Sequence, residues 1–345
     1  MTRAQINRTV VESIVRRSFR EIQRDPKRAI RNLVDLGLEA ADGQFQKKFL
    51  DMAHGILKRE NSPYYTLIQN TVQSVDEDRL MSFGMALGWN SLTQGAKRIR
   101  TEEAQRGHNI PWSMSLHMKA GPGDLSMEDY LRLAQEGTKL GIYSYFLFAE
   151  DVPSVQMALE ISAANRNCAF CLLLPADLEV GMLSQAAIPL NLLLGVDSSA
   201  QDWEEQVRYF RDRRCPYLIY RTYSGKEDVE EIISGHWMER ILPRAGIAAL
   251  LIAQGDAGAA DVSSVYSYVL DARIGQRYPT LALDFYRDNL YVDVCVSQDP
   301  CFLGVLPDGT ITEYKQGREV PMGDSILSKP LAEQLRRFSK PGTNF

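Results

Sequence analysis

The stretch that decides the fold is SMSLHMKAGPGDLSMEDYLRLAQEGTKLGIYSYFLF, residues 113–148. A short strand is expected at Ser113–Met118. Ser126 then caps a helix whose first turn holds two carboxylates, which suit the positive end of the helix dipole. The helix ends at Gly141, because glycine supplies the left-handed position after a helix. A buried strand follows at Ile142–Phe148, so this stretch predicts a β-α-β unit.

The same order of strand and helix repeats along the middle of the chain. Near-even spacing of strands and helices implies a parallel sheet with helices on its faces. Because the count stops at six strands, the sequence predicts an α/β fold with a partial, six-stranded TIM-like parallel β/α barrel. The four further strands are expected at Ala169–Leu174, Leu190–Leu194, Tyr217–Tyr220 and Ala248–Ile252.

Two flanking segments differ from this repeat. The N-terminal segment shows helical spacing of apolar residues without strand-like alternation, which predicts an all-helical extension. After the barrel the pattern becomes β-rich, with strands at Thr280–Phe285 and Leu290–Val296. Two further strands, Phe302–Leu306 and Thr310–Tyr314, flank a predicted hairpin turn at Asp308-Gly309, and a final helix is expected at Leu331–Phe338. The expected division is 1–107 for the helical extension, 108–261 for the barrel and 262–345 for the β-rich segment.

The composition is that of a globular protein, with 45% hydrophobic and 24% charged residues. No run of about 18 apolar residues occurs, so no transmembrane segment is expected. No apolar stretch follows the early charges, so no secretory signal is expected either. Five cysteines, an odd number, lie among ordinary core residues. That usage favours free thiols in a reducing compartment, and the sequence therefore predicts a cytoplasmic protein.

Charge is unevenly distributed along the chain. Residues 1–107 carry 18 Lys and Arg against 13 Asp and Glu, whereas the whole chain has a net charge of −5. An acidic main body argues against a protein built around a nucleic-acid groove. Much of the positive charge lies in residues 1–31, where apolar residues recur at helical spacing. This basic helix either contacts a membrane surface or a partner, or packs on the body with its charges in water.

Polar side chains follow several of the predicted strands. In parallel α/β barrels the reactive groups sit on loops at the C-terminal strand ends. Acidic and hydroxylic groups that converge there could bind a polar ligand or a divalent cation. The alternative is that these aspartates simply cap helices and turns. The candidates are Glu150, Asp151, Asp197, Tyr223 and Asp256.

His117, on the first strand, is the candidate for acid–base chemistry. Such a residue is more often a satisfied core histidine, but beside Asp151 in the barrel lumen it would suit proton transfer. Cys168 and Cys171 have C-x-x-C spacing, yet they lie at a strand entrance with Phe170 between them, which favours a core role. No spacing assembles a nucleophile with its base or a set of metal ligands, so no catalytic residue and no metal site are assigned.

Neither glycine cluster indicates a phosphate-binding loop. Gly121-Pro-Gly123 has a proline where a backbone N–H would be needed, and no Lys-Ser/Thr follows. Gly255-Asp-Ala-Gly258 could cradle an anion at a helix start, but so short a pattern is common by chance. The turn Lys119–Asp124 therefore holds neither a nucleotide loop nor a metal motif.

The framework around that turn resembles radical SAM enzymes. Pro111-Trp112 before a strand, Leu125-Ser-Met-Glu128 and Leu140-Gly-Ile-Tyr-Ser-Tyr145 are similar to the proline–tryptophan strand, L-S-x-E helix start and L-G-I-Y-F-Y strand of a bacterial group with an N-terminal helical extension. Tyr291–Cys295 and Asp308-Gly309 are similar to that group's C-terminal segment. The resemblance implies a barrel that, in the family, carries a [4Fe–4S] cluster which reductively cleaves S-adenosylmethionine.

The family's cluster motif, C-x-x-x-C-x-x-C, is absent from this chain. Only twelve residues separate Trp112 from Leu125, so the cluster loop looks deleted. The family's G-G-E-P turn reads Ala149-Glu-Asp-Val152, with Asp151 at the glutamate position. The resemblance therefore implies a degenerate member without the cluster, for which no cofactor is predicted and only residual S-adenosylmethionine binding stays open.

Three functions stay open for such a protein. The leading hypothesis is a non-catalytic partner or regulatory or scaffold subunit, and an active radical SAM enzyme is one candidate for its protein partner. The second is a module that binds S-adenosylmethionine, a nucleotide or a metal at the C-terminal mouth of the barrel. The third is a cluster-independent enzyme that uses Asp151 with His117 or Tyr223.

Overall fold

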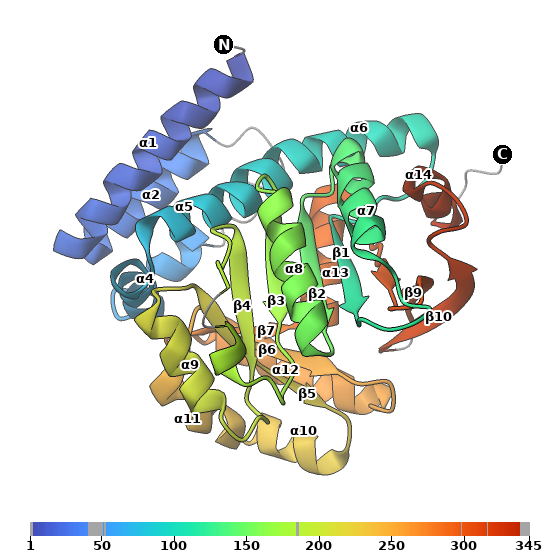
Figure 1. Cartoon of the computed structure of the whole chain (residues 1–345). Coiled ribbons are helices and arrows are strands. Elements are labelled where there is room, and N and C mark those ends of the chain that lie inside the picture. The colour runs from blue at the N-terminus through green and yellow to red at the C-terminus, as the bar shows by residue number, and fades with distance from the viewer. Residues whose placement is uncertain are drawn as a thin grey trace.

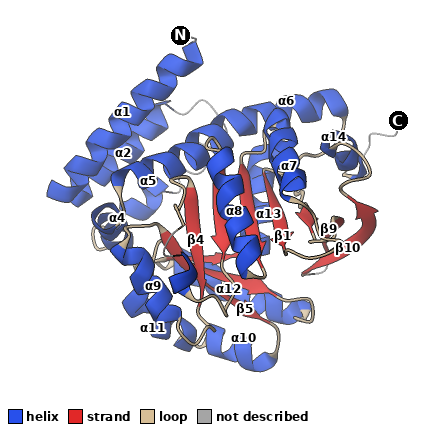
Figure 2. Cartoon of the chain, viewed as in Figure 1, coloured by secondary structure: helices blue, strands red, loops and turns tan. Residues whose placement is uncertain are grey.

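The computed structural model describes residues 3–40, 51, 53–183, 186–297, 299–315 and 317–338. This part of the chain forms a curled sheet flanked by helices (Figure 1). Its ten strands follow the order β10-β9-β8-β1-β2-β3-β4-β5-β6-β7. The strands from β8 to β7 in that order are parallel to their neighbours, whereas β9 and β10 are antiparallel (Figure 2). Because β7 and β8 lie apart in the order, the sheet is a half-barrel.

Most parallel strands lead into a helix on the outside of the half-barrel. The sequence of elements is β1 (Ser113–Met118), α7 (Met127–Leu140), β2 (Ser144–Ala149), α8 (Val152–Ala164), β3 (Ala169–Leu173), β4 (Leu192–Asp197), α9 (Trp203–Asp212), β5 (Tyr217–Tyr223), α10 (Lys226–Ile233), α11 (His236–Ile241), β6 (Ala248–Ala253), α12 (Ala259–Ile274), β7 (Leu281–Asp284), α13 (Phe285–Ser297), β8 (Gly304–Val305), β9 (Thr310–Lys315), β10 (Arg318–Ser325) and α14 (Leu331–Gln334).

The helix starts follow the residues that the sequence marks as caps. The Ser126 side chain accepts from the backbone N–H of Asp129, whose carboxylate accepts from Ser126 in return, so α7 begins with a capping box. Asp151 and Ser154 make the equivalent box at the start of α8. Gly141 follows α7 with φ of 103°, a conformation that costs glycine little. The β-α-β unit predicted from residues 113–148 is confirmed.

The prediction of six parallel strands was wrong, because the described residues form eight parallel strands. The six predicted strands correspond to β1–β6, and the half-barrel architecture is as expected. The seventh strand, β7, continues the parallel series beside β6. The eighth, β8, pairs with β1 on the side away from β2 and has only two residues. This strand lies within the predicted strand Phe302–Leu306, but two paired residues carry no period that would indicate its place beside β1.

The prediction of a strand at Leu290–Val296 was wrong, because these residues belong to α13. The Asp284 carboxylate accepts a hydrogen bond from the backbone N–H of Arg287 at 2.9 Å, which caps the helix as soon as β7 ends. Apolar residues alternate at Leu290, Val292, Val294 and Val296 and mimic a strand. The helices α12 and α13 occupy much of 262–297, so the β-rich character holds mainly for β8, β9 and β10. The hairpin predicted around Asp308-Gly309 is confirmed as the antiparallel pair β8–β9.

Helix α13 lies against the inner face of the half-barrel. Figure 1 shows α7 and α8 in front of the sheet and α13 behind it. The Phe285 ring makes edge contacts with Phe146 and Phe148, at centroid distances of 5.0 and 5.2 Å. One turn later, Asn289 accepts from the Ser113 hydroxyl at 2.8 Å. The inner face is therefore covered by the chain's own helix.

The hairpin β9–β10 reaches across the C-terminal mouth from the opposite side. Arg318, near its tip, donates to the backbone carbonyl of Gly255, on the loop after β6, at 3.1 Å. Aromatic rings from α13 and the hairpin also pack together, with Tyr286 stacked on Tyr314 at 4.8 Å. The helix and the hairpin together span the opening that the incomplete sheet leaves.

The N-terminal segment is helical, as predicted, over the residues that are described. Its elements are α1 (Arg3–Arg24), α2 (Pro26–Ala40), α4 (Pro63–Ser74), α5 (Glu77–Gly84), a π-helix (Met85–Gly95) and α6 (Ala96–Arg106). The first three build a small core of their own around Ile22, Ile30 and Tyr65. Ala96 and Ile99 belong instead to the core of the half-barrel. Residues 41–50 of the predicted extension lie outside the described part.

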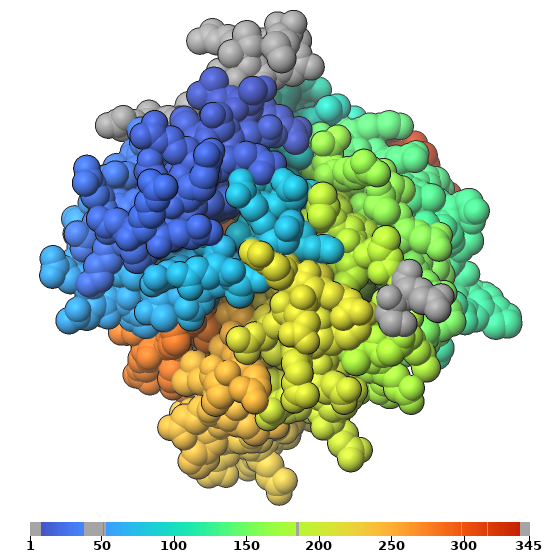
Figure 3. Space-filling view, turned by 60° about the vertical axis from the view of Figure 1, so that its left-hand side comes forward, coloured from blue at the N-terminus to red at the C-terminus, as the bar shows by residue number. Residues whose placement is uncertain are grey.

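Helix α1 packs on its neighbours and keeps most of its charges at the surface. Ile22 is buried, and Arg16 pairs with Glu77 and Asp78 at the start of α5 at 3.0 and 2.9 Å. Figure 3 shows the N-terminal helices, in blue, forming one surface with the cyan and yellow segments of the body. This geometry favours the packed interpretation of the basic helix. Among the described helices, none is both long and apolar enough to cross a membrane.

Candidate functional site

Three of the predicted site residues, Glu150, Asp151 and Asp256, lie at the mouth without forming a common site. Glu150 is exposed, and its carboxylate lies 3.9 Å from the ammonium of Lys119. Asp151 accepts from the backbone N–H groups of Ser154 at 2.8 Å and Ala120 at 3.2 Å. Burial raises the pKa of Asp151, but these hydrogen bonds outweigh it and lower the pKa overall. Asp256 is exposed in the turn after β6.

Asp197, at the end of β4, is buried but satisfied within its own turn. Its carboxylate accepts from the backbone N–H of Ser199 at 2.8 Å and from the Ser199 hydroxyl at 2.7 Å. The alternative that these aspartates cap helices and turns therefore describes Asp151 and Asp197. Each of these two carboxylates already accepts two hydrogen bonds from neighbouring parts of the chain.

His117 enters a different cluster from the one expected. Its ring stacks on Phe148, with centroids 4.6 Å apart. Its Nε2 lies 3.3 Å from the Glu319 carboxylate, so Glu319 of β10, and not Asp151, is its acidic partner. The pairing of His117 with Asp151 was wrong because Asp151 already caps α8, whereas the hairpin carries Glu319 over the mouth.

Glu319 is held by three donors from three different elements. Besides His117 on β1, the Tyr286 hydroxyl on α13 donates to it at 3.2 Å, and the Thr312 hydroxyl on β9 donates to its other oxygen. The side chain is only 11% exposed. Burial raises the pKa of Glu319, but hydrogen bonds from its partners outweigh burial and hold the pKa below its usual value. We call His117, Tyr286 and Thr312 the cradle of Glu319.

Gly304 on β8 makes the cradle possible. A Cβ atom at this position would collide with the Glu319 carboxylate and the Thr312 hydroxyl. Gly304 is paired with Ser115 of β1 in the sheet, so the carboxylate lies directly above the joint between these strands. Only glycine leaves room there for a carboxylate and its donors.

Tyr223, the second predicted residue that joins a cluster, lies beside Asp284. Its hydroxyl is 3.5 Å from the Asp284 carboxylate, and Asp284 is 1% exposed. Burial raises the pKa of Asp284 to about 6, even though the N–H of Arg287 and the Tyr223 hydroxyl favour its charged form. The charge on Asp284 also raises the pKa of Tyr314, on the hairpin, after the larger effect of burial. The two clusters therefore adjoin at the mouth.

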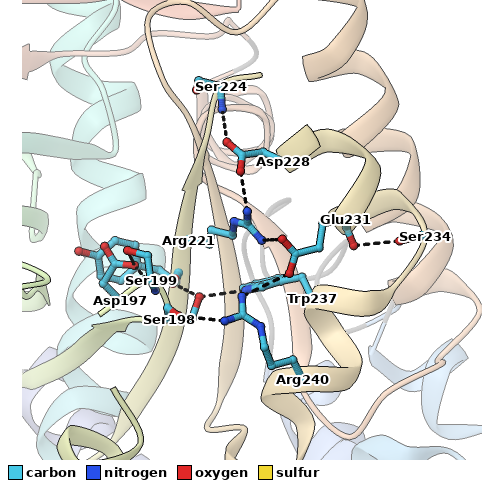
Figure 4. A network of polar contacts seen from close by, with 11 residues as sticks. Asp197, Ser198, Ser199, Arg221, Ser224, Asp228, Glu231, Ser234, Trp237 and Arg240 are labelled. Carbon is cyan, nitrogen blue, oxygen red and sulfur yellow. Dashed lines mark hydrogen bonds and ion pairs between the residues drawn. The ribbon is translucent and has the colours of Figure 1, made fainter. Parts of the chain in front are cut away.

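A third polar network lies on the outer side of the strand ends and is shown in Figure 4. Arg221 of β5 pairs with Asp228 at 2.6 Å and with Glu231 at 2.5 Å, both on α10. Arg240 of α11 pairs with Glu231 at 3.4 Å and donates to the carbonyl of Ser198 at 3.3 Å. This network ties the loop after β4 to α10 and α11. The charged side chains of this network pair with one another, so we assign the network a structural role.

Replacing Arg221 by methionine is expected to lower the free energy of unfolding by about 2 kcal/mol. The guanidinium is 13% exposed, and its loss leaves two carboxylates without their cation. Breaking a fully buried pair costs about 3–5 kcal/mol, and these carboxylates are about one third exposed, so the cost is smaller. Denaturant unfolding measures it. The matched control is Arg240→Met, 44% exposed, for which a loss above about 1 kcal/mol would contradict this account.

The cysteines play the core role that the sequence favours. All five are buried and free. Burial raises the pKa of Cys168 and of Cys171 to about 12, so both are protonated thiols at neutral pH. Within the described ranges, no three His, Cys, Asp or Glu side chains are grouped as metal ligands.

The turn Lys119–Asp124 is compact. The N–H of Asp124 bonds to the carbonyl of Gly121 at 3.2 Å, and the next residue, Leu125, bonds to the carbonyl of Pro307 at 2.6 Å. The turn thus leads directly from β1 into the cap of α7, beside the loop before β9.

The residues that sequence reasoning missed are Glu319, Tyr286, Thr312 and Asp284. Glu319 and His117 are 202 positions apart, and no spacing rule connects a hairpin to the first strand. Asp284 could have been identified from the sequence, because an aspartate is a preferred N-cap residue and can mark the start of a helix.

No protein-family model matches the chain, and no curated protein matches it.

Proposed function

We propose that this protein is a degenerate radical-SAM-like half-barrel that works without a cluster, as a non-catalytic partner or regulatory or scaffold subunit in the cytoplasm. The observation that carries this proposal is the filling of the inner face. Phe285, Tyr286, Phe302 and Tyr314 pack together where a barrel enzyme would receive its substrate. An active radical SAM enzyme is the partner that the resemblance suggests.

Two features support the proposal from the chemistry of the site. Two of the predicted acidic residues have local structural roles: Asp151 caps helix α8, and Asp197 accepts hydrogen bonds within its own turn. Cys168 and Cys171 are buried thiols beside and within β3, and burial raises the pKa of each to about 12. A cluster requires thiolates on an accessible loop.

The test is anaerobic reconstitution of the full chain with iron and sulfide. The expected result is a colourless protein with iron well below one atom per chain, and no saturable rise in melting temperature with S-adenosylmethionine. A stoichiometric cluster with visible charge-transfer absorption would overturn the proposal. A second experiment tests for the partner directly. The tagged chain is expected to co-purify with an enzyme, and adding the chain to that enzyme is expected to change its reaction rate.

A second candidate function, a small-molecule binding module, is favoured by one observation. The mouth holds a cradle of polar donors, His117, Tyr286 and Thr312, around the carboxylate of Glu319, and Gly304 leaves the space that this carboxylate fills.

A further inference from the structure

The outward face of helix α1 carries a row of cations. The helix packs on α2, α4 and α5 with its other side, where Ile22 is buried. Five exposed residues recur at intervals of three or four, so they lie in one row along the helix. They are Val10, Ser13, Arg17, Arg20 and Arg24. We call this row the basic stripe.

The cations of the basic stripe are largely free to meet another molecule. Arg17 pairs with Glu21 one turn later at 2.7 Å, yet its side chain is 79% exposed. Within the described part of the chain, Arg20 and Arg24 belong to no ion pair. Val10, at the other end of the stripe, adds an apolar side chain that is 52% exposed.

A groove of opposite charge lies between helix α9 and the loop that follows β3. Its lining includes one cation, Arg208, and five carboxylates: Asp177, Glu179, Asp202, Glu204 and Glu205. Glu204 pairs with Arg244 at 3.5 Å. Among the described residues, no cation pairs with Asp177, Glu179 or Glu205. We call this surface the acidic groove.

The basic stripe and the acidic groove match each other in length and composition. The charged part of each follows about two turns of helix, or about 10 Å, over 17–24 on α1 and over 202–208 on α9. Met182, three residues after Glu179 on the loop, is 50% exposed, so the groove also has an apolar neighbour, as the stripe has Val10. Surfaces of opposite charge and similar extent are complementary.

The two surfaces lie on the same side of the molecule. Figure 1 places α1 and α9 on one side, and Figure 3, which turns this side forward, shows the blue segment of α1 together with the yellow segment that includes α9. A twofold rotation about an axis through this side brings α1 of each copy over α9 of the other. Both contacts then form at once and the assembly closes.

We propose that two copies of the chain form a twofold-symmetric dimer in which the basic stripe of each molecule binds the acidic groove of the other. Both halves of the contact lie on this chain, and each supplies the charge that the other lacks. Exposed charge pairs are individually weak and are screened by salt. The dimer is therefore expected at low salt and high protein concentration. This inference goes beyond the function proposed above and holds with or without a second protein partner.

Sedimentation equilibrium of the full-length protein tests for the dimer. At about 50 mM salt, the mass is expected to rise from 38.9 kDa toward twice that value as the protein concentration increases. The dissociation constant should increase about tenfold or more when the salt is raised to about 500 mM, because the charges are then screened. A monomer at every concentration up to about 0.5 mM in low salt, or a mass that keeps growing beyond a dimer, would overturn the proposal.

A charge swap assigns the dimer to these two surfaces. Arg20→Glu with Arg24→Glu reverses the basic stripe, and Glu179→Lys with Glu205→Lys reverses the acidic groove. Each double variant alone should be a monomer where wild type is a dimer. An equimolar mixture should form a dimer again, because the two reversed surfaces meet each other and the two native surfaces also meet. A mixture that stays monomeric, with both variants melting as wild type does, contradicts the proposed contact.

The matched control changes the net charge equally at another place. Lys139→Glu with Arg166→Glu reverses two exposed cations outside both surfaces, and this variant should dimerise as wild type does. If it dissociates as far as the stripe variant does, net charge and not the basic stripe determines the association, and the proposal is wrong.

Vesicles of phosphatidylserine and phosphatidylcholine test the other occupant that suits a basic helix. In low salt, wild-type protein that stays monomeric in solution but binds these vesicles, and loses that binding on reversal of the stripe, would assign the stripe to a membrane surface and overturn the dimer. The iron and S-adenosylmethionine measurements described above test the proposed function and leave this result unaffected.

Discussion

Replacing Phe285 by alanine is expected to lower the free energy of unfolding by about 3–5 kcal/mol, the range for a large aromatic residue in a packed core. Phe285 is 3% exposed and lies at the centre of the packing between α13 and the inner face. Its ring contacts the rings of Phe146, Phe148, Tyr286 and Phe302 at centroid distances between 4.8 and 6.3 Å. Removal leaves a cavity that these rings cannot all close at once.

Urea unfolding followed by circular dichroism measures this loss, and the midpoint should fall while the denaturant slope stays constant. The matched control is Tyr291→Ala on the same helix, because Tyr291 is 54% exposed. It should cost less than about 1 kcal/mol. Similar losses in the two variants would show that α13 does not pack on the inner face through Phe285.

Asp284 is expected to make folding less favourable as the pH rises from about 4 to about 7. Its pKa in the folded protein is about 6, raised by burial from 3.8, so the folded state binds the proton more tightly than the unfolded state does. Stability from this group is therefore highest below pH 3.8 and falls as the pH passes through 6. The full difference is about 3 kcal/mol, at about 1.36 kcal/mol for each pKa unit.

Asp284→Asn isolates this contribution. The stability of the variant relative to wild type should rise by about 3 kcal/mol between pH 3.5 and pH 7.5, measured by denaturant unfolding across that range. Asp308→Asn is the control with opposite sign. The N–H and hydroxyl of Thr310 lower the pKa of Asp308, so this carboxylate favours folding at higher pH. A pH-independent difference for Asp284→Asn would mean that Asp284 is accessible to water.

The parts of the fold that local chemistry specifies were predictable. Ser126 and Asp151 each accept the N–H three residues on, and such caps are legible in a single turn of sequence. The apolar runs of β1–β6 are long enough to stand out. The strand β8 lies within the predicted strand Phe302–Leu306, but its parallel pairing with β1 was not predicted, because so short a pairing carries no period. Helix α13 was missed because alternating valines favour a strand when the cap at Asp284 is overlooked.

Only one member of each polar pair in the candidate site was predictable from the sequence. His117 and Tyr223 were identified because barrel chemistry collects at the ends of β1 and β5. Their partners Glu319 and Asp284 come from elements whose course over the mouth depends on long-range packing. Asp151 and Asp197 were identified by the same rule and turned out to be satisfied locally. The position of a residue at the end of a strand identifies it as a candidate. Whether its side chain joins a site depends on the hydrogen-bond partners that the rest of the fold brings to it.

The pairing of β8 with β1 sets the order in which the chain can mature. Ser115 and Gly304 are neighbours in the sheet although almost the whole half-barrel separates them in sequence. As the protein emerges from the ribosome, β1 acquires β2 early but keeps its other edge open until the last part of the chain has been made. Closure over such a span is slow. The nascent protein therefore carries an uncovered, adhesive border for most of its synthesis, and chaperones have a defined interval in which to shield it.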